Sequence, residues 1–323
     1  MNFKYPNNLS NGKVAKKKSL GQNFLKDESI LNKIISAGEL SKKDNVLEIG
    51  PGEGALTKRL LEIVARVVAI EKDERMKDKN SILQQICSKE DLSSKIKIYF
   101  DDILKVDLVN ILKENNFTGG KNKYKVIANI PYYITGKIIR LLFEQEQKPE
   151  LIILLVQKEV AERICADNGR QSILSLSVQY YAQAEIVDYV PKESFDPAPK
   201  VDSAILKITP LQNNGSSVDY LEVNKNKIKK EKEESVLSKK VLNTENSRQS
   251  KRGGNIQEKE FFRLIKIGFS SPRKVLINNL KNGLQLDKKD LEKIFNNLNL
   301  PLDIRAEKLT IKNWISLSKI IFK

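Results

Sequence analysis

Short aliphatic runs alternate with segments of helical length through the first two thirds of the chain, and this alternation narrows the possible folds more than any other feature. The runs cover residues 46–49, 67–70, 96–100, 124–128 and 151–156, and a helical pattern follows the first run at 55–63. Strands that are apolar on both faces are typical of parallel sheets covered by helices on each side. Two later runs, 184–190 and 203–208, are expected to be closing strands. We therefore predict an α/β class domain with a doubly wound, Rossmann-like, mainly parallel sheet.

The composition changes after residue 210. Residues 213–258 are rich in Asn, Ser, Lys and Glu, and a segment with so few apolar side chains is expected to be a disordered or loosely helical insertion. Helical spacing resumes with Phe261, Leu264, Ile265 and Phe269, and continues at 275–280, 291–298 and 311–321. The predicted organisation is a basic flexible tail at 1–20, the α/β domain at 21–210, and a small C-terminal helical domain at 211–323 that contains the insertion.

The charge balance limits the partners and the chemistry. The chain has 57 Lys and Arg against 41 Asp and Glu, a net charge of +16. Such a balance favours a polyanionic partner, because phosphates that are neutralised by the protein release their counterions. The alternative explanation of the charge is a general lysine bias of the proteome. There is no histidine, which excludes histidine triads, histidine metal sites and histidine general bases. Cys87 and Cys165 lack metal-ligand spacing, predict no disulfide, and suit a reducing cytoplasm.

No apolar run is long enough to span a bilayer, and the N-terminus lacks the apolar region of a signal peptide. We therefore expect no membrane partner. Because the chain has no histidine and its two cysteines lack metal-ligand spacing, we also expect no bound metal.

A glycine-rich loop and two acidic residues follow successive predicted strands. Gly50 and Gly52 let the backbone approach a ligand closely, although GxGxG spacing alone is a weak signal. Glu71 ends the second strand, where a carboxylate can accept both ribose hydroxyls of an adenosine. Asp102 ends the third and can accept from an adenine amine; Asp101 competes for this role, and either acid could instead cap a helix. Together these features favour S-adenosylmethionine over NAD.

The segment Asn129-Ile130-Pro131-Tyr132 directly follows the fourth predicted strand. An exocyclic aromatic amine is a poor nucleophile, because its lone pair is delocalised into the ring. Two acceptors, the Asn129 side-chain oxygen and the Ile130 carbonyl, can draw the nitrogen towards tetrahedral geometry and stabilise the positive charge that develops. Pro131 restricts the backbone of Ile130, which helps to aim that carbonyl. The segment therefore predicts methylation of a nucleobase amine without a strong base.

Two aromatic residues are candidates for holding the base. Tyr132 offers a face on which an extruded base can stack. Phe195 begins a Pro-containing loop at 195–203 and could close the other face of the base. It could equally be a core side chain that anchors the loop, and the sequence leaves both interpretations open.

Several motifs together resemble the ribosomal RNA adenine N6-dimethyltransferases, and among them the bacterial KsgA (RsmA) type. They are LGQNFL at 20–25, LEIGPGEGALT at 47–57, NIPYYI at 129–134, LVQKEVAER at 155–163, FDPAPKVDS at 195–203, residues 269–280, and RAEKL at 305–309. The resemblance covers nearly the whole chain except the tail and 213–258. This chain departs from the family pattern in two places. The motif at 129–134 more often begins Asn-Leu-Pro-Tyr-Asn in the family, so that Ile130 and Tyr133 differ, and the long insertion is atypical.

The resemblance implies a methyltransferase domain at 21–210 and a helical domain that helps to hold ribosomal RNA. The implied contacts with S-adenosylmethionine fall on Asn23, Leu25, Gly50, Gly52, Glu71, Asp102 and Asn129. The implied reaction is N6,N6-dimethylation of two adjacent adenines in the hairpin loop near the 3′ end of 16S rRNA, within a small ribosomal subunit or its precursor. A monomeric enzyme with a role in small-subunit biogenesis is expected.

Two alternatives remain at this point. One is an Erm-type enzyme that methylates an adenine in 23S rRNA; Pro51 and the segments at 195–203 and 305–309 favour the small-subunit type instead. The other is a non-catalytic rRNA-binding assembly factor on the same scaffold. The intact set of Gly50, Glu71, Asp102 and Asn129 argues against that second alternative.

Overall fold

The computed structural model describes residues 22–79, 81–89, 92–118, 123–166, 171–211 and 256–322. The predicted tail at 1–20 and most of the predicted insertion at 213–258 lie outside these residues. The chain divides into two compact units, one of Met1–Cys165 with Gln183–Pro210 and one of Ala166–Ala182 with Leu211–Lys323. Each unit is described by itself below.

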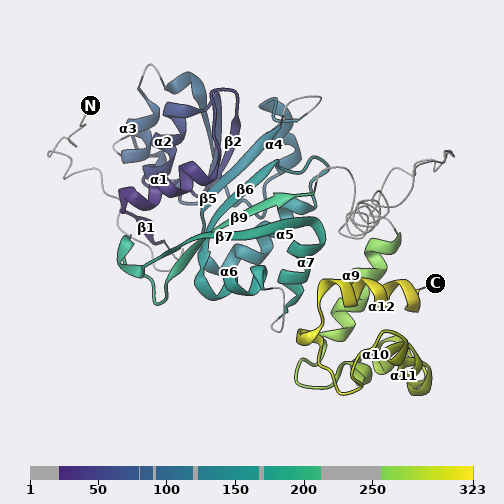
Figure 1. Cartoon of the computed structure of the whole chain (residues 1–323). Helices are drawn as coiled ribbons and strands as arrows, with labels where there is room; N and C mark the ends of the chain where they lie inside the picture. Colours follow the sequence, from purple (N-terminus) through teal and green to yellow (C-terminus); the bar gives the residue numbers. More distant parts are fainter. Residues whose placement is uncertain are drawn as a thin grey trace, which may run out of the picture. The chain divides into compact units, whose positions relative to one another are not determined.

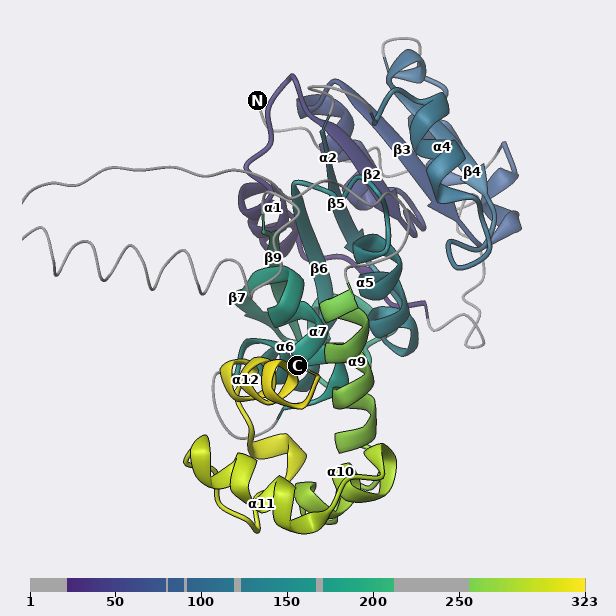
Figure 2. The ribbon, with the colours of Figure 1, turned by 90° about the vertical axis from the view of Figure 1, so that its right-hand side faces the viewer.

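The first unit is built on a seven-stranded sheet of order β4-β3-β2-β5-β6-β9-β7. Its strands are β2 (Asn45–Ile49), β3 (Arg66–Glu71), β4 (Ile96–Phe100), β5 (Tyr124–Asn129), β6 (Leu151–Gln157), β7 (Ala182–Val190) and β9 (Ser203–Pro210). Strands β4, β3, β2, β5 and β6 run parallel to one another, and β9 is antiparallel to β6. Figure 2 shows β3, β2, β5 and β6 side by side.

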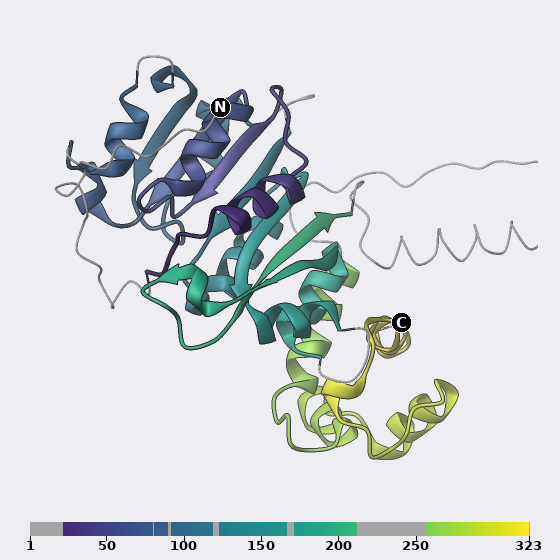
Figure 3. The ribbon, with the colours of Figure 1, turned by 60° about the vertical axis from the view of Figure 1, so that its left-hand side comes forward.

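Helices cover both faces of this sheet, which explains why its central strands are mostly apolar. The helices are α1 (Glu28–Ala37), α2 (Ala55–Ile63), α3 (Ile82–Cys87), α4 (Leu108–Glu114), α5 (Thr135–Phe143) and α6 (Lys158–Cys165). Helices α1, α2 and α3 lie on one face and α4 and α5 on the other (Figure 1), and Figure 3 shows α1 across the first of these faces. The side chains of Leu47, Val68, Val126 and Ile153 are fully buried.

A second, two-stranded sheet fixes the chain just ahead of α1. It joins β1 (Phe24–Leu25) to β8 (Phe195–Asp196) in antiparallel register, with Leu25 opposite Phe195. Lys26 extends the pairing, because its amide donates to the carbonyl of Ser194 at 2.9 Å and its ammonium pairs with Asp196. The start of the described chain is therefore held against the loop that precedes β9.

The second unit is a helical bundle with its own core. Its helices are α7 (Ile173–Tyr181), α9 (Ile256–Gly268), α10 (Leu276–Leu284), α11 (Lys288–Asn297) and α12 (Ile311–Ile321). Trp314 is buried at the centre and stacks on Phe269, while Tyr180 of α7 stacks on Phe261 of α9 with ring centroids 4.4 Å apart. Capping boxes at Ser172 and Thr310 begin α7 and α12. Apolar packing along these helix faces thus closes a core independent of the sheet.

The predicted fold class is confirmed, since the sheet is mainly parallel and doubly wound and a helical unit follows it. The observed units differ from a division at residue 210 in one segment: α7 packs with the C-terminal helices, because Leu176 and Tyr180 contribute to their core. Helix α9 begins at Ile256, inside the range predicted as an insertion. Among the described residues, no helix has the length and apolar character needed to cross a membrane.

The packing of Phe261 predicts how the helical unit responds to a core deletion. Phe261 is 1% exposed, so Phe261→Ala should lower the free energy of unfolding of this unit by about 3–5 kcal/mol. Trp314, the one tryptophan of the sequence, lies in the same core, so its emission during urea unfolding reports on this unit. Lys266→Ala, at an exposed position of α9, is the control and should change stability by less than about 0.5 kcal/mol. Equal midpoints for the two variants would contradict this packing.

Candidate active site

The parallel register brings the ends of four strands to one edge of the sheet. Ile49 of β2 lies opposite Ile70 of β3 and Ala128 of β5, and Glu71 lies opposite Phe100 of β4. The residues that follow, among them Gly50, Asp101 and Asn129, therefore meet at the carboxyl edge, where ligands bind in open α/β sheets.

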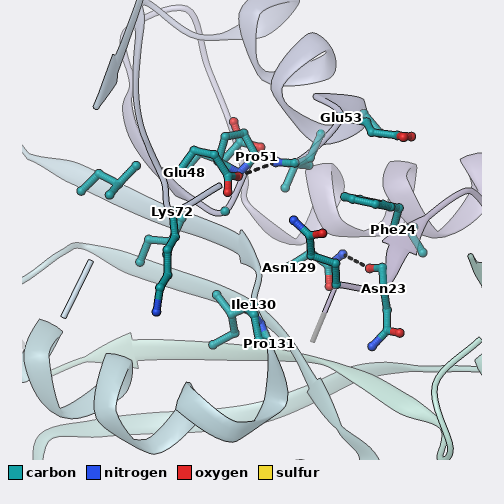
Figure 4. Close-up of a pocket in the computed structure, with 18 of the residues that line it drawn as sticks. Asn23, Phe24, Glu48, Pro51, Glu53, Lys72, Asn129, Ile130 and Pro131 are labelled. Atoms are coloured by element: carbon teal, nitrogen blue, oxygen red, sulfur yellow. Dashed lines mark hydrogen bonds between the residues drawn. The ribbon is translucent and has the colours of Figure 1, made fainter. Parts of the chain in front are cut away.

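A single pocket at this edge contains nearly all the residues predicted from the sequence. Of the predicted site residues, those that line it are Asn23, Leu25, Gly50, Gly52, Glu71, Asp102, Asn129, Ile130, Pro131 and Tyr132. Figure 4 shows the side chains of Asn23, Phe24, Glu48, Lys72 and Asn129 around this pocket. The structure thus gathers residues from the N-terminal segment, the glycine loop and the ends of β3, β4 and β5.

The glycine loop adopts a backbone that favours glycine. Gly50, Gly52 and Gly54 have φ values of +70°, +57° and +83°, in the left-handed region. Gly54 is the N-cap of α2, and the amide of Gly52 donates to Glu71 Oε2 at 2.9 Å. A Cβ on Gly52 would lie 2.8 Å from the Phe24 ring. The loop therefore fits closely between the end of β3 and the N-terminal segment.

Glu71 is held by backbone amides on both carboxylate oxygens. Its Oε1 accepts from the amide of Asp73 at 2.7 Å, and its Oε2 accepts from Gly52 as above. Burial raises the pKa of Glu71, and the two amide bonds act against that rise without cancelling it. Each oxygen keeps a second lone pair, so the carboxylate is oriented and still able to accept from hydroxyls.

Asp102 is engaged with a lysine. Its Oδ1 accepts from the amide of Leu104 at 3.0 Å, and its Oδ2 lies 2.9 Å from the ammonium of Lys72. Burial acts to raise the pKa of Asp102, but the hydrogen bonds from Lys72 and Leu104 and the lysine charge outweigh it, so that the pKa is lowered. Asp101, the competing candidate, also lines the pocket and accepts from the amide of Asp102 at 2.6 Å. A ligand amine at Asp102 would share this carboxylate with Lys72.

The side chain of Asn129 is oriented by the N-terminal segment. Its Nδ2 donates to the backbone carbonyl of Asn23 at 3.1 Å (Figure 4). Only the amide nitrogen can donate to a carbonyl, so the bond fixes which end of the side chain is the oxygen. Gln22 anchors the same segment, because its Nε2 donates to Asp73 Oδ2 at 2.9 Å. The Asn129 oxygen is consequently left as an acceptor at the pocket.

The residues that follow Asn129 are also held in place by the protein. Ile130 is buried, and Pro131 precedes a short 3-10 helix, η4 (Tyr132–Ile134). The hydroxyl of Tyr132 lies 2.6 Å from the Oγ of buried Ser203 on β9. Burial raises the pKa of Tyr132, with the Ser203 bond acting against it. The Tyr132 ring is therefore fixed in place and neutral near pH 7.

Phe195 is not brought to the pocket. It is 4% exposed, belongs to the core cluster that contains Leu25 and Ile205, and is absent from the residues that line the pocket. Pairing with Leu25 in the β1–β8 sheet holds it there. Of the two interpretations left open by the sequence, this arrangement matches the side chain that anchors the loop, and the stacking role stays a prediction.

No role was predicted for Glu48, which the structure places in the lining of the pocket. Glu48 is 1% exposed, and its Oε2 has no hydrogen-bond partner among the described residues. Burial raises its pKa to about 8, with Thr57 acting against the rise and nearby Glu71 adding to it. An acidic residue inside an otherwise aliphatic strand, two positions before Gly50, was the signal that could have singled it out.

Comparison with known proteins decides the family. The model for the ribosomal RNA adenine dimethylases matches residues 13–252. Ribosomal RNA small subunit methyltransferase A of Lachnoclostridium phytofermentans is 38% identical over 310 residues, 94% of this chain and 91% of that protein. The protein of the same name from Ligilactobacillus salivarius is 36% identical over 312 residues, 95% of this chain and 90% of that one. A crystal structure of a dimethyladenosine transferase from Plasmodium falciparum is 26% identical with a TM-score of 0.64, covering 91% of this chain and 95% of that chain.

The chain belongs to the ribosomal RNA adenine dimethylase family. The resemblance inferred from the sequence motifs is thereby confirmed. Membership of a methyltransferase family implies the use of S-adenosylmethionine, and the pocket fits that molecule. The unpartnered Glu48 oxygen can accept a hydrogen bond from an amino group, the oriented Glu71 suits a ribose diol, and the glycine backbone leaves room where side chains would intrude.

The raised pKa of Glu48 predicts a pH dependence of stability. The carboxyl loses its proton near pH 4.5 when unfolded and near pH 8 when folded, so between these values the folded state holds the extra proton. Stability should therefore fall as pH rises from about 4.5 to 8, by up to about 1.4 kcal/mol per pH unit from this group. Glu48→Gln should remove that slope and gain stability relative to the natural protein as pH rises. Urea unfolding followed by circular dichroism between pH 5 and 8 measures the difference, and parallel curves would refute the assignment.

Proposed function

We propose that this chain transfers methyl groups from S-adenosylmethionine to the N6 amines of two adjacent adenines in the 3′-terminal hairpin loop of 16S rRNA, as a step of small-subunit biogenesis in the cytoplasm. Family membership and the full-length similarity to proteins named ribosomal RNA small subunit methyltransferase A support the substrate. The net charge of +16 suits an RNA partner.

The pocket residues divide into those that hold the methyl donor and those that hold the base. When bound, S-adenosylmethionine supplies an activated methyl group. Glu71 accepts from the ribose hydroxyls, Asp102 from the adenine amine, and Glu48 faces the amino-acid end. Asn23, Leu25, Gly50 and Gly52 shape the walls between them. These residues orient the donor and exclude water from the transfer.

The base is held where β5 ends. The Asn129 oxygen and the Ile130 carbonyl accept the two hydrogens of the adenine amine, which frees its lone pair for attack. Both dipoles stabilise the positive charge that grows on the nitrogen. The methylated amine is acidic and releases its proton to water, so no imidazole is required. Tyr132, fixed by Ser203, offers its face to the base.

The observation that carries this proposal is the bond from Asn129 Nδ2 to the Asn23 carbonyl. It commits the amide nitrogen to the protein and leaves the oxygen for the substrate amine. A preorganised acceptor needs no rearrangement during reaction, which is the source of its catalytic effect.

Replacing Asn129 should abolish efficient transfer while leaving RNA binding intact. We expect Asn129→Ala to lower single-turnover methyl transfer to unmethylated small subunits by at least about 100-fold, because a preorganised dipole is lost. Ile130→Leu is the control: the side chain is buried and only its carbonyl is assigned a role, so activity should stay within a few-fold of the natural protein. Near-normal turnover by Asn129→Ala would contradict the mechanism.

Donor binding tests the other half of the pocket. Glu71→Ala should weaken S-adenosylmethionine binding measured by calorimetry by roughly tenfold or more, because hydrogen bonds to a charged group contribute about 1.5–3 kcal/mol. Glu62→Ala, an exposed carboxylate on α2, should bind as the natural protein does. Absence of binding to the natural protein would instead favour a non-catalytic assembly factor on this scaffold.

A further inference from the structure

Tyr133 is an aromatic side chain that the proposed reaction does not use. It lines the pocket, yet it is 61% exposed, more than any other large hydrophobic side chain in the described part of the chain. It also occupies a position where the family motif more often has Asn. A tyrosine exposed at the mouth of a nucleobase pocket presents a stacking surface.

The neighbouring aromatic groups cannot supply that surface. Tyr132 is half-buried and tied to Ser203, so its ring belongs to the base held at Asn129. Phe24 also lines the pocket but is half-buried, and Phe195 is not among the lining residues. Tyr133 is therefore the exposed ring among the aromatic residues that line the pocket.

The short helix η4 sets the directions in which the side chains of Tyr132 and Tyr133 point. Tyr132 and Tyr133 are consecutive residues of this 3-10 helix. A 3-10 helix has about three residues per turn, so consecutive side chains point about 120° apart. Rings that diverge in this way cannot sandwich one base between them, and each ring can instead meet a different base.

We propose that Tyr133 stacks on the nucleobase next to the adenine held at Asn129, so that the two tyrosines receive two consecutive bases of the RNA. Lys72 lines the same pocket with a half-exposed side chain whose ammonium pairs with Asp102, so a cation lies near the proposed RNA site. This inference rests on the proposed function and adds to it that the protein also contacts the base adjacent to the adenine that it methylates. Two adjacent adenines suit such a site, because each can be the neighbour of the other.

A double-mutant cycle between protein and RNA tests the contact. The natural protein and Tyr133→Leu would be assayed for methyl transfer to unmethylated small subunits that carry either the two adenines or one adenine next to a uridine. Stacking of a base on an aromatic side chain contributes free energy to binding, so Tyr133→Leu should raise KM for the substrate with two adenines by about tenfold, with kcat much less affected. With the uridine neighbour, which stacks weakly, Tyr133→Leu should cost less than about threefold. Tyr133→Phe, which keeps the ring, should behave as the natural protein.

The proposal would be overturned if Tyr133→Leu and the uridine substitution raised KM by independent factors that simply multiply. An unchanged KM in Tyr133→Leu would overturn it as well. Failure of the natural protein to methylate either subunit would count against the proposed function instead.

A binding measurement keeps the two failures apart. An RNA hairpin would carry 2-aminopurine beside a single adenine; this base lacks the 6-amino group, so it takes the neighbouring position. Its emission should be quenched by the natural protein and by Tyr133→Phe, and should stay bright with Tyr133→Leu at equal occupancy. Equal quenching by all three proteins would overturn the stacking role whether or not methyl transfer occurs.

Discussion

The site depends first on the parallel register of β2 with β3 and β5. Because Ile49 lies opposite both Ile70 and Ala128, the glycine loop, Glu71 and Asn129 emerge at the same level of one sheet edge. A shift of one residue in β5 would turn Asn129 to the opposite face and remove the acceptor from the pocket. The buried aliphatic side chains of these strands set the register, so the hydrophobic core places Glu71 and Asn129 at the pocket.

The segment 22–25 then completes the pocket. It crosses the sheet edge and contacts three parts of the wall: Gln22 bonds Asp73, the Asn23 carbonyl bonds Asn129, and Phe24 packs against Gly52. Leu25 fixes its far end by pairing with Phe195. A segment remote in sequence thus orients the side-chain amide of Asn129, and it links the loop before β9 to the same pocket. Phe195 contributes to the site through this support.

Much of this was predictable from sequence, because the central strands are mostly apolar and the glycine loop, Glu71 and Asp102 follow or end them. The strand positions and the helix at 55–63 lie where the pattern predicted them. The predicted site residues other than Phe195 line one pocket, and their roles stay predictions. Partners in space were not predictable: the Lys72–Asp102 pair, the Asn129–Asn23 bond and the packing of α7 with the C-terminal helices all join segments distant in sequence. Glu48 was missed because its strand was classed as apolar as a whole, although the acidic residue among aliphatic neighbours is visible in the sequence.

The central claim, an adenine amine methylated at the β5 edge within 16S rRNA, is tested most directly by mapping the product. Unmethylated small and large ribosomal subunits would be mixed with the protein and labelled S-adenosylmethionine, and the modified nucleotides located by mass spectrometry. The account predicts N6,N6-dimethyladenosine at two adjacent positions of the 3′-terminal 16S rRNA loop, with the large subunit unlabelled. Label on 23S rRNA, or none on either subunit, would contradict it.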